Sequence, residues 1–266
     1  MFEKMLYGGK SLYFRYAPPL TDLDAISDDE LPNAPYVGAP KHKRSVYFYW
    51  WAFLRENEDY IACCDAGGTG SMQQLYADFG DVRGDSFMDW WRAGGRLLFC
   101  EPPEESITTY LSPPTDQIPQ DRVLLSVPVT GDLERTMAEM RKILREAFEY
   151  ERRRRIREEG AVDAFSRANY PVFKKPVLTA LHERLIVHQA KKENPNASLY
   201  EIGKMTGVAQ RTAGVEGDAE HRNVVGASVS RSLKEAKALI YNVGSGRFPD
   251  TTPPPKVSTE NMAKSA

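Results

Sequence analysis

Apolar residues recur at three- and four-residue intervals in the stretch from Leu178 to Pro249, the most regular part of the chain. A helix is predicted over residues 178–190, and its apolar face carries Leu178, Leu181, Leu185, Ile186 and Ala190. Residues 193–196 end this helix, because the residue before a proline avoids helical geometry.

A second, shorter helix is predicted directly after it. Ser198 and Glu201 have the spacing of a capping box, in which the serine side chain and the glutamate side chain each accept from the other residue's backbone N–H. The helix should run through residues 202–205 and stop at Gly207, since glycine readily adopts the left-handed conformation of a helix end. A capped short helix, a glycine and the small apolar Val208 form a common opening of a helix-turn-helix.

The recognition helix of such a motif should follow at once, but residues 209–224 are polar, contain glycines and show no period. A strongly amphipathic helix is predicted only over residues 228–243. Its buried side carries Val229, Leu233, Ala236, Leu239, Ile240 and Val243. Arg231, Lys234 and Lys237 fall on the other side, where a phosphate or a base edge could be contacted.

Cations of this stretch define the candidate interface. The residues expected to contact double-stranded DNA are Arg211, Arg222, Arg231, Lys234 and Lys237. Arg211 and the glycine-containing residues 209–224 are the candidates for a segment that becomes ordered when DNA binds. The alternative is a purely structural helical domain, because exposed cations on a helix commonly form a solvated surface.

The densest aromatic segment is Ser45–Ala66. Ser45 can cap a helix whose large side chains are Tyr47, Trp50, Trp51, Leu54, Tyr60, Ile61 and Cys64. Because Trp and Tyr bury large areas, this helix is expected to nucleate an N-terminal core. A platform on which nucleic-acid bases stack is the functional alternative.

Two strands are predicted over residues 96–101 and 122–129, on either side of a proline-rich loop. A lone two-stranded ribbon needs a covering helix, and the amphipathic residues 132–159 supply one whose first half should pack on the strands. The end of that helix carries the run Arg152–Arg155. A helix disperses such a run around its circumference, so we interpret this part as a solvated connecting helix, with phosphate contact as the alternative.

These elements predict a mainly helical α+β fold in four parts. Residues 1–44 form an irregular lead-in, and residues 45–160 form an aromatic-cored module with the small β-ribbon and the long charged helix. Residues 161–249 form the helix-turn-helix-like domain, and residues 250–266 form a disordered tail. The lead-in contains Lys41–Arg44, which we interpret as a solvated loop, with a basic patch for nucleic acid as the alternative.

The composition is that of a folded protein, with 41% hydrophobic and 11% aromatic residues. The net charge of −2 conceals an asymmetry: residues 161–266 hold 15 Lys/Arg and 10 Asp/Glu, a net of +5, and the rest holds 20 and 27, a net of −7. A basic C-terminal part favours nucleic acid as its partner. Three cysteines form no disulfide framework, and neither a signal sequence nor a membrane span is visible, so we expect a cytoplasmic protein.

Catalytic chemistry is not expected. The four histidines have no carboxylate or cysteine at metal-ligand spacing, so we predict no metal and no other cofactor. The segment Asp65–Gly70 resembles the phosphate turn of the sugar-kinase and actin superfamily, but it follows a helical pattern and fits a glycine-rich helix stop better. Asp78, Asp81, Asp85 and Asp89 could form a metal-binding nuclease cluster, and surface acids are the preferred interpretation.

Further stretches carry a resemblance to known proteins; they are Trp51–Tyr60, Tyr76–Gly80, Trp90–Trp91, Ser230–Ile240 and Gly246–Pro249. Together they resemble uncharacterised proteins of bacterial mobile elements and prophages. The resemblance covers about half of the chain, and the motifs that carry it are structural. The resemblance implies a bacterial DNA-associated role. We therefore expect a non-enzymatic DNA-binding protein, a transcriptional regulator or accessory factor of a mobile element. The alternatives are a structural subunit that binds a protein partner or forms a homodimer, and a nucleotide-dependent enzyme.

Overall fold

The computed structural model describes residues 6–7, 10–20, 22–84, 86–101, 123, 125, 127, 132–159, 166 and 168–254. The chain divides into two compact units, and each is considered by itself. The first joins Met1–Pro103 to Arg167–Ala266, and the second is the intervening segment Glu104–Ser166. Two segments that are far apart in the sequence therefore build the first unit together.

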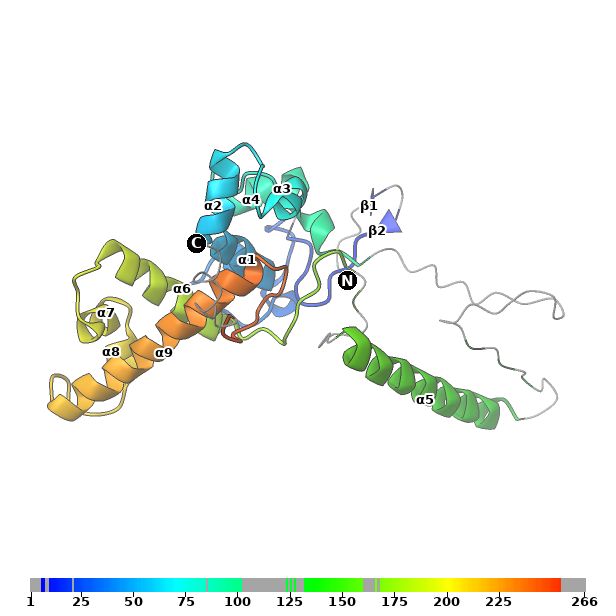
Figure 1. The fold of residues 1–266 in the computed structure, drawn as a ribbon. Coiled ribbons are helices and arrows are strands. Elements are labelled where there is room, and N and C mark those ends of the chain that lie inside the picture. The colour runs from blue at the N-terminus through cyan, green and yellow to red at the C-terminus, as the bar shows by residue number, and fades with distance from the viewer. Residues whose placement is uncertain are drawn as a thin grey trace, which may run out of the picture. The chain divides into compact units, whose positions relative to one another are not determined.

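Helices dominate the described part of the chain (Figure 1). The first unit holds α1 (Val46–Leu54), α2 (Glu58–Asp65), α3 (Gln73–Phe79), α4 (Phe87–Ala93), α6 (Leu178–Glu193), α7 (Leu199–Met205), α8 (Val208–Arg211) and α9 (Ala219–Val243). It also holds the short 3-10 helices η1 (Asp28–Glu30), η2 (Lys41–Arg44) and η3 (Gly95–Leu98), and the paired dipeptides β1 (Leu6–Tyr7) and β2 (Lys10–Ser11). The second unit holds α5 (Leu133–Glu159).

The predicted α+β class is wrong, because the described part of the chain is mainly helical and the expected β-ribbon is not found in it. Residues 96–100 lie in η3 and in a turn rather than in a strand, and Glu101 forms an isolated β-bridge with Tyr13. Of residues 122–129, the structure describes positions 123, 125 and 127, and these belong to no strand. The two dipeptide strands of the lead-in are too short to form a sheet layer.

A glycine pair explains why residues 96–101 do not extend. Leu97 donates to the Gly94 carbonyl over 2.8 Å, which closes a 3-10 turn. Gly95 lies against the Trp90 indole, where a Cβ would come within 2.7 Å of the ring. Phe99 is then buried among aromatic rings. The apolar run that predicted a strand is therefore explained by packing in a turn.

The helix α1 lies at the centre of the larger core. All nine of its residues are buried, and none is charged. Ser45 starts the helix as predicted, because its side chain accepts from the Tyr47 N–H over 3.2 Å. The single helix expected over residues 45–66 is divided at Asn57, whose side chain caps α2 by accepting from the Tyr60 N–H over 2.9 Å.

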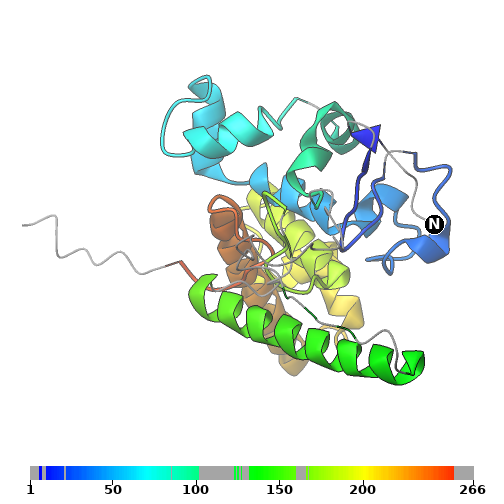
Figure 2. The ribbon, with the colours of Figure 1, turned by 90° about the vertical axis from the view of Figure 1, so that its right-hand side faces the viewer.

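Aromatic rings fill the space around α1. Trp50 lies 5.1 Å from Phe99 and 5.4 Å from Phe248, and Tyr47 lies 5.4 Å from Trp91, all between ring centroids. In Figure 2, α2, α3 and α4 lie on one side of α1, and α6 and α9 lie on the other. Because these rings are buried, they form a core and are not accessible to stack on bases.

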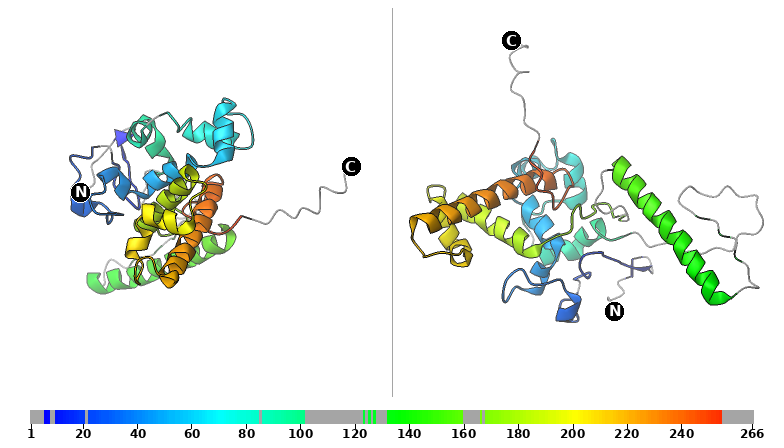
Figure 3. Two further views of the ribbon diagram at one scale, coloured as in Figure 1. Left: turned by 90° about the vertical axis from the view of Figure 1, so that its left-hand side faces the viewer. Right: turned by 90° about the horizontal axis from the view of Figure 1, so that it is seen from below.

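The helices α6 and α9 run side by side in opposite directions and belong to both cores of the first unit (Figure 3). Near α1 they contribute Leu181 and Leu239 to the larger core. Farther along, Val187 and Val229 belong to a smaller core that is shared with α7 and α8. The larger core therefore contains residues from both sides of the boundary that was expected between residues 160 and 161.

Polar contacts fix α6 to the turn that follows α1. The Glu56 carboxylate accepts from Lys192 over 2.8 Å and from Gln189 over 3.0 Å, and it lies 3.6 Å from the His188 ring. The contact with His188 lowers the pKa of Glu56 most, burial raises it, and the bonds from Lys192 and Gln189 lower it further, to about 2. Glu56 is therefore charged when the protein is folded at neutral pH.

The C-terminal end of the first unit is held by a buried carboxylate. Asp250 accepts from Lys174 over 2.7 Å and from Arg247 over 2.8 Å. Burial raises the pKa of Asp250, but the hydrogen bonds from Lys174 and Thr252 outweigh it, so the pKa is lowered. The first residue of the expected disordered tail is thus fixed, and residues 255–266 lie outside the described part.

Candidate nucleic-acid interface

The candidate interface is built on α7 and the turn that follows it. Ser198 Oγ accepts from the Glu201 N–H over 3.3 Å, and Glu201 Oε2 accepts from the Ser198 N–H over 2.7 Å, so the predicted capping box is present. The bonds from Ser198 lower the pKa of Glu201. Gly207 then adopts a left-handed φ of 75°, and α8 begins at Val208.

A close approach between α7 and α9 holds the turn in place. Gly203 sits at the contact, where a Cβ would lie 2.3 Å from Val225 Cγ1 and 3.3 Å from Val229 Cγ2. Ile202 and Val208 are buried in the smaller core beside these valines. The turn is therefore locked against the first half of α9.

The helix α9 begins at Ala219, well before the expected start at residue 228. His221, Val225 and Val229 are buried at four-residue spacing and extend the apolar face toward the N-terminus. His221 Nε2 lies 3.1 Å from the Ala209 carbonyl, which fixes this end to α8. The inserted stretch 209–224 thus contains most of α8, a short loop and the first turns of α9.

Arg231, Lys234 and Lys237 lie exposed on α9, away from its buried face. No hydrogen bond or ion pair joins their side chains to any residue that the structure describes. At ~1.5 Å per residue, the three cations extend over ~9 Å of the helix. We call these three exposed cations the α9 stripe.

Every other Lys or Arg between residues 178 and 243, a fully described range, has an assigned contact. These contacts join Arg184 to Glu235 (2.6 Å), Lys191 to the Pro195 carbonyl (2.9 Å), Lys192 to Glu56 (2.8 Å), Lys204 to Glu216 (3.8 Å), Arg211 to Glu183 (3.0 Å) and Arg222 to the Tyr200 ring (5.7 Å). The α9 stripe therefore differs from its surroundings in keeping its charges available.

Arg211 lies in a contact that joins three helices. Its guanidinium pairs with Glu183 of α6 over 3.0 Å and donates to the Gly207 carbonyl over 3.1 Å. Glu183 also accepts from Ser232 of α9 over 3.0 Å. Arg211 thus fixes α8 to α6 and α9, and it is not part of the α9 stripe.

Arg222 is also separate from the α9 stripe. Its guanidinium lies over the Tyr200 ring, 5.7 Å from the centroid, on the side of α9 that faces α7. Nine residues at ~100° each place Arg222 on the opposite side of the helix from Arg231. Of the five candidate residues, the structure therefore brings three together.

Two polar residues that the sequence reasoning missed share the side of α9 that carries the stripe. Asn223 is exposed and Ser230 is half-exposed, and the helical repeat places both on the same side as Lys234. A third polar residue, Gln210, is exposed on α8. The signal that could have identified Asn223 is the four-residue spacing of His221 and Val225, which shows that the helix begins early.

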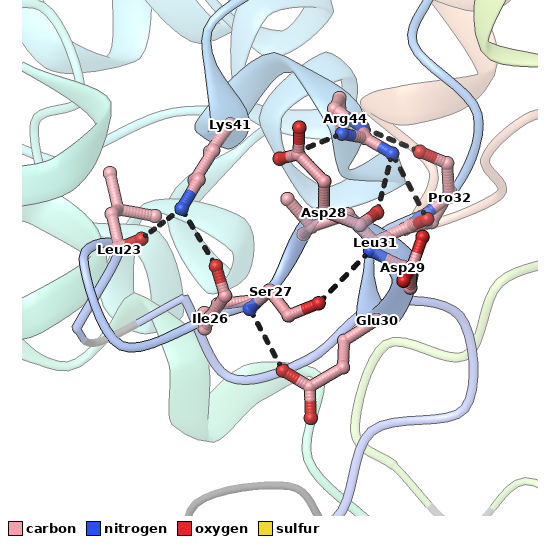
Figure 4. A network of polar contacts seen from close by, with 10 residues as sticks. All are labelled: Leu23, Ile26, Ser27, Asp28, Asp29, Glu30, Leu31, Pro32, Lys41 and Arg44. Carbon is pink, nitrogen blue, oxygen red and sulfur yellow. Dashed lines mark hydrogen bonds and ion pairs between the residues drawn. The ribbon is translucent and has the colours of Figure 1, made fainter.

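The basic run Lys41–Arg44 is structural, so its interpretation as a solvated loop is wrong (Figure 4). Lys41 donates to the carbonyls of Leu23 and Ile26 over 2.8 and 2.7 Å. Arg44 donates to three further carbonyls of the lead-in and pairs with Asp28 over 3.2 Å. These cations hold residues 22–32 in place, and their charges are not available to a nucleic acid.

The described members of the acidic group considered as a metal site, and the nearby Asp65, contact basic or hydroxyl side chains of the first unit. Asp65 and Asp81 both pair with Arg83, whose hydrogen bonds lower the pKa of Asp81 to about 2. Asp78 accepts from a tyrosine hydroxyl and Asp89 from Ser86, while Asp85 lies outside the described residues. Among the described residues, no group of three or more potential metal ligands occurs.

Comparisons of the chain with protein-family models, with curated proteins and with solved structures find no match. Among the helices that the structure describes, none combines the length and apolar character that crossing a lipid bilayer requires.

Proposed function

We propose that this chain is a non-enzymatic protein that binds double-stranded DNA through the α9 stripe. The observation that carries the proposal is the contrast between cations in one helical region. Arg231, Lys234 and Lys237 keep their charges exposed, whereas the other cations between residues 178 and 243 have protein contacts. Exposed Lys and Arg on a rigid helix are suited to contact phosphate oxygens.

The surroundings of the α9 stripe support this role. The capped helix α7 and the left-handed Gly207 support an interpretation as the turn of a helix-turn-helix, and the smaller core joins this turn to α9. Gln210, Asn223 and Ser230 add polar side chains, at least partly exposed, of the kind that contact phosphates and base edges. The net charge of +5 in residues 161–266 attracts a polyanion to this part of the chain.

The resemblance of Trp51–Tyr60 and Ser230–Ile240 to proteins of bacterial mobile elements extends the proposal. We place the chain in the cytoplasm as a transcriptional regulator or accessory factor of such an element. Contacts to phosphates position a protein on DNA without selecting a sequence, so the target sequence would be read by neighbouring polar side chains.

The experiment is a titration of the full chain with duplex DNA across a salt series. Each phosphate contact contributes ~−0.9 to the slope of log affinity against log salt, so three contacts give a slope of ~−2.7. The triple variant R231Q/K234Q/K237Q should lose most of this slope and bind more weakly at every salt concentration.

A matched control removes the same charge elsewhere. Lys142, Arg145 and Arg153 are exposed on α5, so K142Q/R145Q/R153Q changes the net charge by the same amount. The control variant should bind like the wild type. Equal losses in both triple variants would assign binding to net charge alone, and unchanged binding of the α9 variant would refute the proposal.

A further inference from the structure

The helix α5 carries an apolar seam with coiled-coil spacing. Alternating steps of four and three residues connect Leu133, Met137, Met140, Leu144 and Ala147. Leu133 and Met137 are 70% and 39% exposed, and Ile143 beside the seam is 46% exposed. A helix with such an apolar seam is stabilised mainly by packing of the seam against a partner helix, and less by helix propensity.

We propose that α5 pairs with α5 of a second copy of this chain, in antiparallel orientation. The charge pattern along the helix selects the orientation. The apolar seam is followed in the sequence by Glu151 and then by the run Arg152–Arg155. Glu151 and Arg154 continue the four- and three-residue spacing of the seam, so a parallel pair would set each of them beside its own copy, which is destabilising. An antiparallel pair places the two arginine runs at opposite ends.

One antiparallel register matches both the seam and its flanking charges. In this register Leu133 packs against the partner's Leu144, and Met137 packs against the partner's Met140. Glu134 then lies opposite the partner's Arg141, and the two-fold symmetry forms this ion pair twice. Both residues are exposed, and neither has an ion-pair partner among the described residues of its own chain.

Two charges on the outer face of α5 are already joined within the helix. Arg135 pairs with Glu139 over 3.2 Å at a spacing of four residues. Glu134 and Arg141 are instead seven residues apart, on the same edge of the seam, and carry opposite charges. In a symmetric antiparallel dimer, Glu134 of each copy can therefore pair with Arg141 of the other. The overlap covers only ~18 Å of helix, so the dimer should form in the micromolar range.

The test of pairing is sedimentation of the full chain over a range of concentrations. The wild type should pass from monomer to dimer as concentration rises. Met137→Glu places a charge in the seam and should weaken dimerisation at least tenfold. Ala138→Glu introduces the same side chain on the outer face and should leave dimerisation unchanged. A wild-type chain that stays monomeric at concentrations on the order of 200 µM, or equal effects of the two variants, overturns the proposal.

The test of orientation is a charge exchange. Glu134→Arg and Arg141→Glu should each weaken the dimer, because each sets like charges opposite one another twice. The double variant E134R/R141E restores both ion pairs only in the antiparallel register, so it should regain wild-type dimerisation. A double variant as weak as the single ones rejects this register. The tests need no DNA, so their failure leaves the DNA-binding proposal to its own titration.

Discussion

Asn57, at the start of α2, donates from Nδ2 to the Ile240 carbonyl of α9 over 2.7 Å, across 183 residues of sequence. The same side chain caps α2 through Oδ1. Gly244 leaves room for this contact, because a Cβ there would lie 2.8 Å from Asn57 Nδ2. One buried amide therefore joins the N-terminal helices to the helix that carries the α9 stripe.

Replacing Asn57 should destabilise the whole first unit. Asn57→Ala removes the cap and leaves a buried carbonyl without its donor, at a combined cost of about 2–4 kcal/mol in the free energy of unfolding. Asn57→Ser keeps a capping oxygen but is too short to reach Ile240, so it should cost about half as much. Urea unfolding of the full chain measures both variants. Equal losses would show that the hydrogen bond to Ile240, and not the cap, carries the effect.

The close contact at Gly203 predicts opposite effects for two glycine substitutions. Gly203→Ala forces a Cβ to within 2.3 Å of Val225 Cγ1 and should destabilise by about 1–3 kcal/mol. Gly226→Ala meets only Leu199 Cβ at 3.9 Å, and its higher helix propensity should stabilise by about 0.5–1 kcal/mol. Thermal unfolding compares them. Similar melting temperatures for both variants would contradict the tight packing of α7 on α9.

Glu56 predicts a loss of stability in acid. Its pKa is held at about 2, below its ordinary value of 4.5, so the folded state binds the proton less readily than the unfolded state. The charged Glu56 therefore stabilises the folded state above pH 4.5. This stabilisation is lost as the pH falls from 4.5 to about 2. It is on the order of 2–3 kcal/mol for this largely buried side chain.

The variant Glu56→Gln isolates this contribution from that of other acids. It should be less stable than the wild type at neutral pH, because Lys192 and His188 lose a charged partner. The difference between the two proteins should shrink as the pH falls from 4.5 toward 2, because Glu56 of the unfolded wild-type chain takes up a proton in this range while the folded carboxylate does so only near pH 2. Unfolding in urea at several pH values gives the difference directly. A difference that stays constant with pH would rule out this assignment.

The carbonyl contacts of Arg44 predict a local effect on the lead-in. Arg44→Ala removes the donor to the carbonyls of Pro32, Asp28 and Leu31 and should cost about 2 kcal/mol. Limited proteolysis should then cut residues 22–35 faster. Lys43→Ala is the matched control, because Lys43 lies over the Tyr36 and Phe48 rings and binds no carbonyl among the described residues. Equal protection of the two variants would refute the proposed role.

Local signals in the sequence predicted the parts of the site that depend on neighbouring residues. The capping box of Ser198 and Glu201 and the stop at Gly207 follow from backbone chemistry within a few residues, and both are present. The exposed side of α9 at Arg231 and Lys234 follows from its helical period. These features need no knowledge of the rest of the chain.

Features that depend on distant residues were not predictable in this way. The run Leu97–Cys100 has the composition of a strand, but the Trp90 indole against Gly95 and the glycine turn favour a 3-10 helix. The separation of Arg211 from the α9 stripe depends on Glu183, which a single sequence does not place nearby. In both places the observed structure depends on side-chain contacts that the local sequence pattern does not show.

The division of the five candidate cations predicts different effects of single substitutions on DNA binding. Arg231→Gln should reduce the salt slope by ~0.9, the contribution of one phosphate contact. Arg211→Gln should leave the slope unchanged, because Glu183 already neutralises this side chain, and it should cost less than about 1 kcal/mol in stability since the pair is partly exposed. Arg222→Gln should resemble Arg211→Gln, because its guanidinium lies over Tyr200 on the opposite side of α9. A salt titration of each variant measures these slopes under conditions in which all of the variants are folded. A larger loss of slope for Arg211→Gln than for Arg231→Gln would move the interface from α9 to α8, where the recognition helix of a helix-turn-helix was first expected.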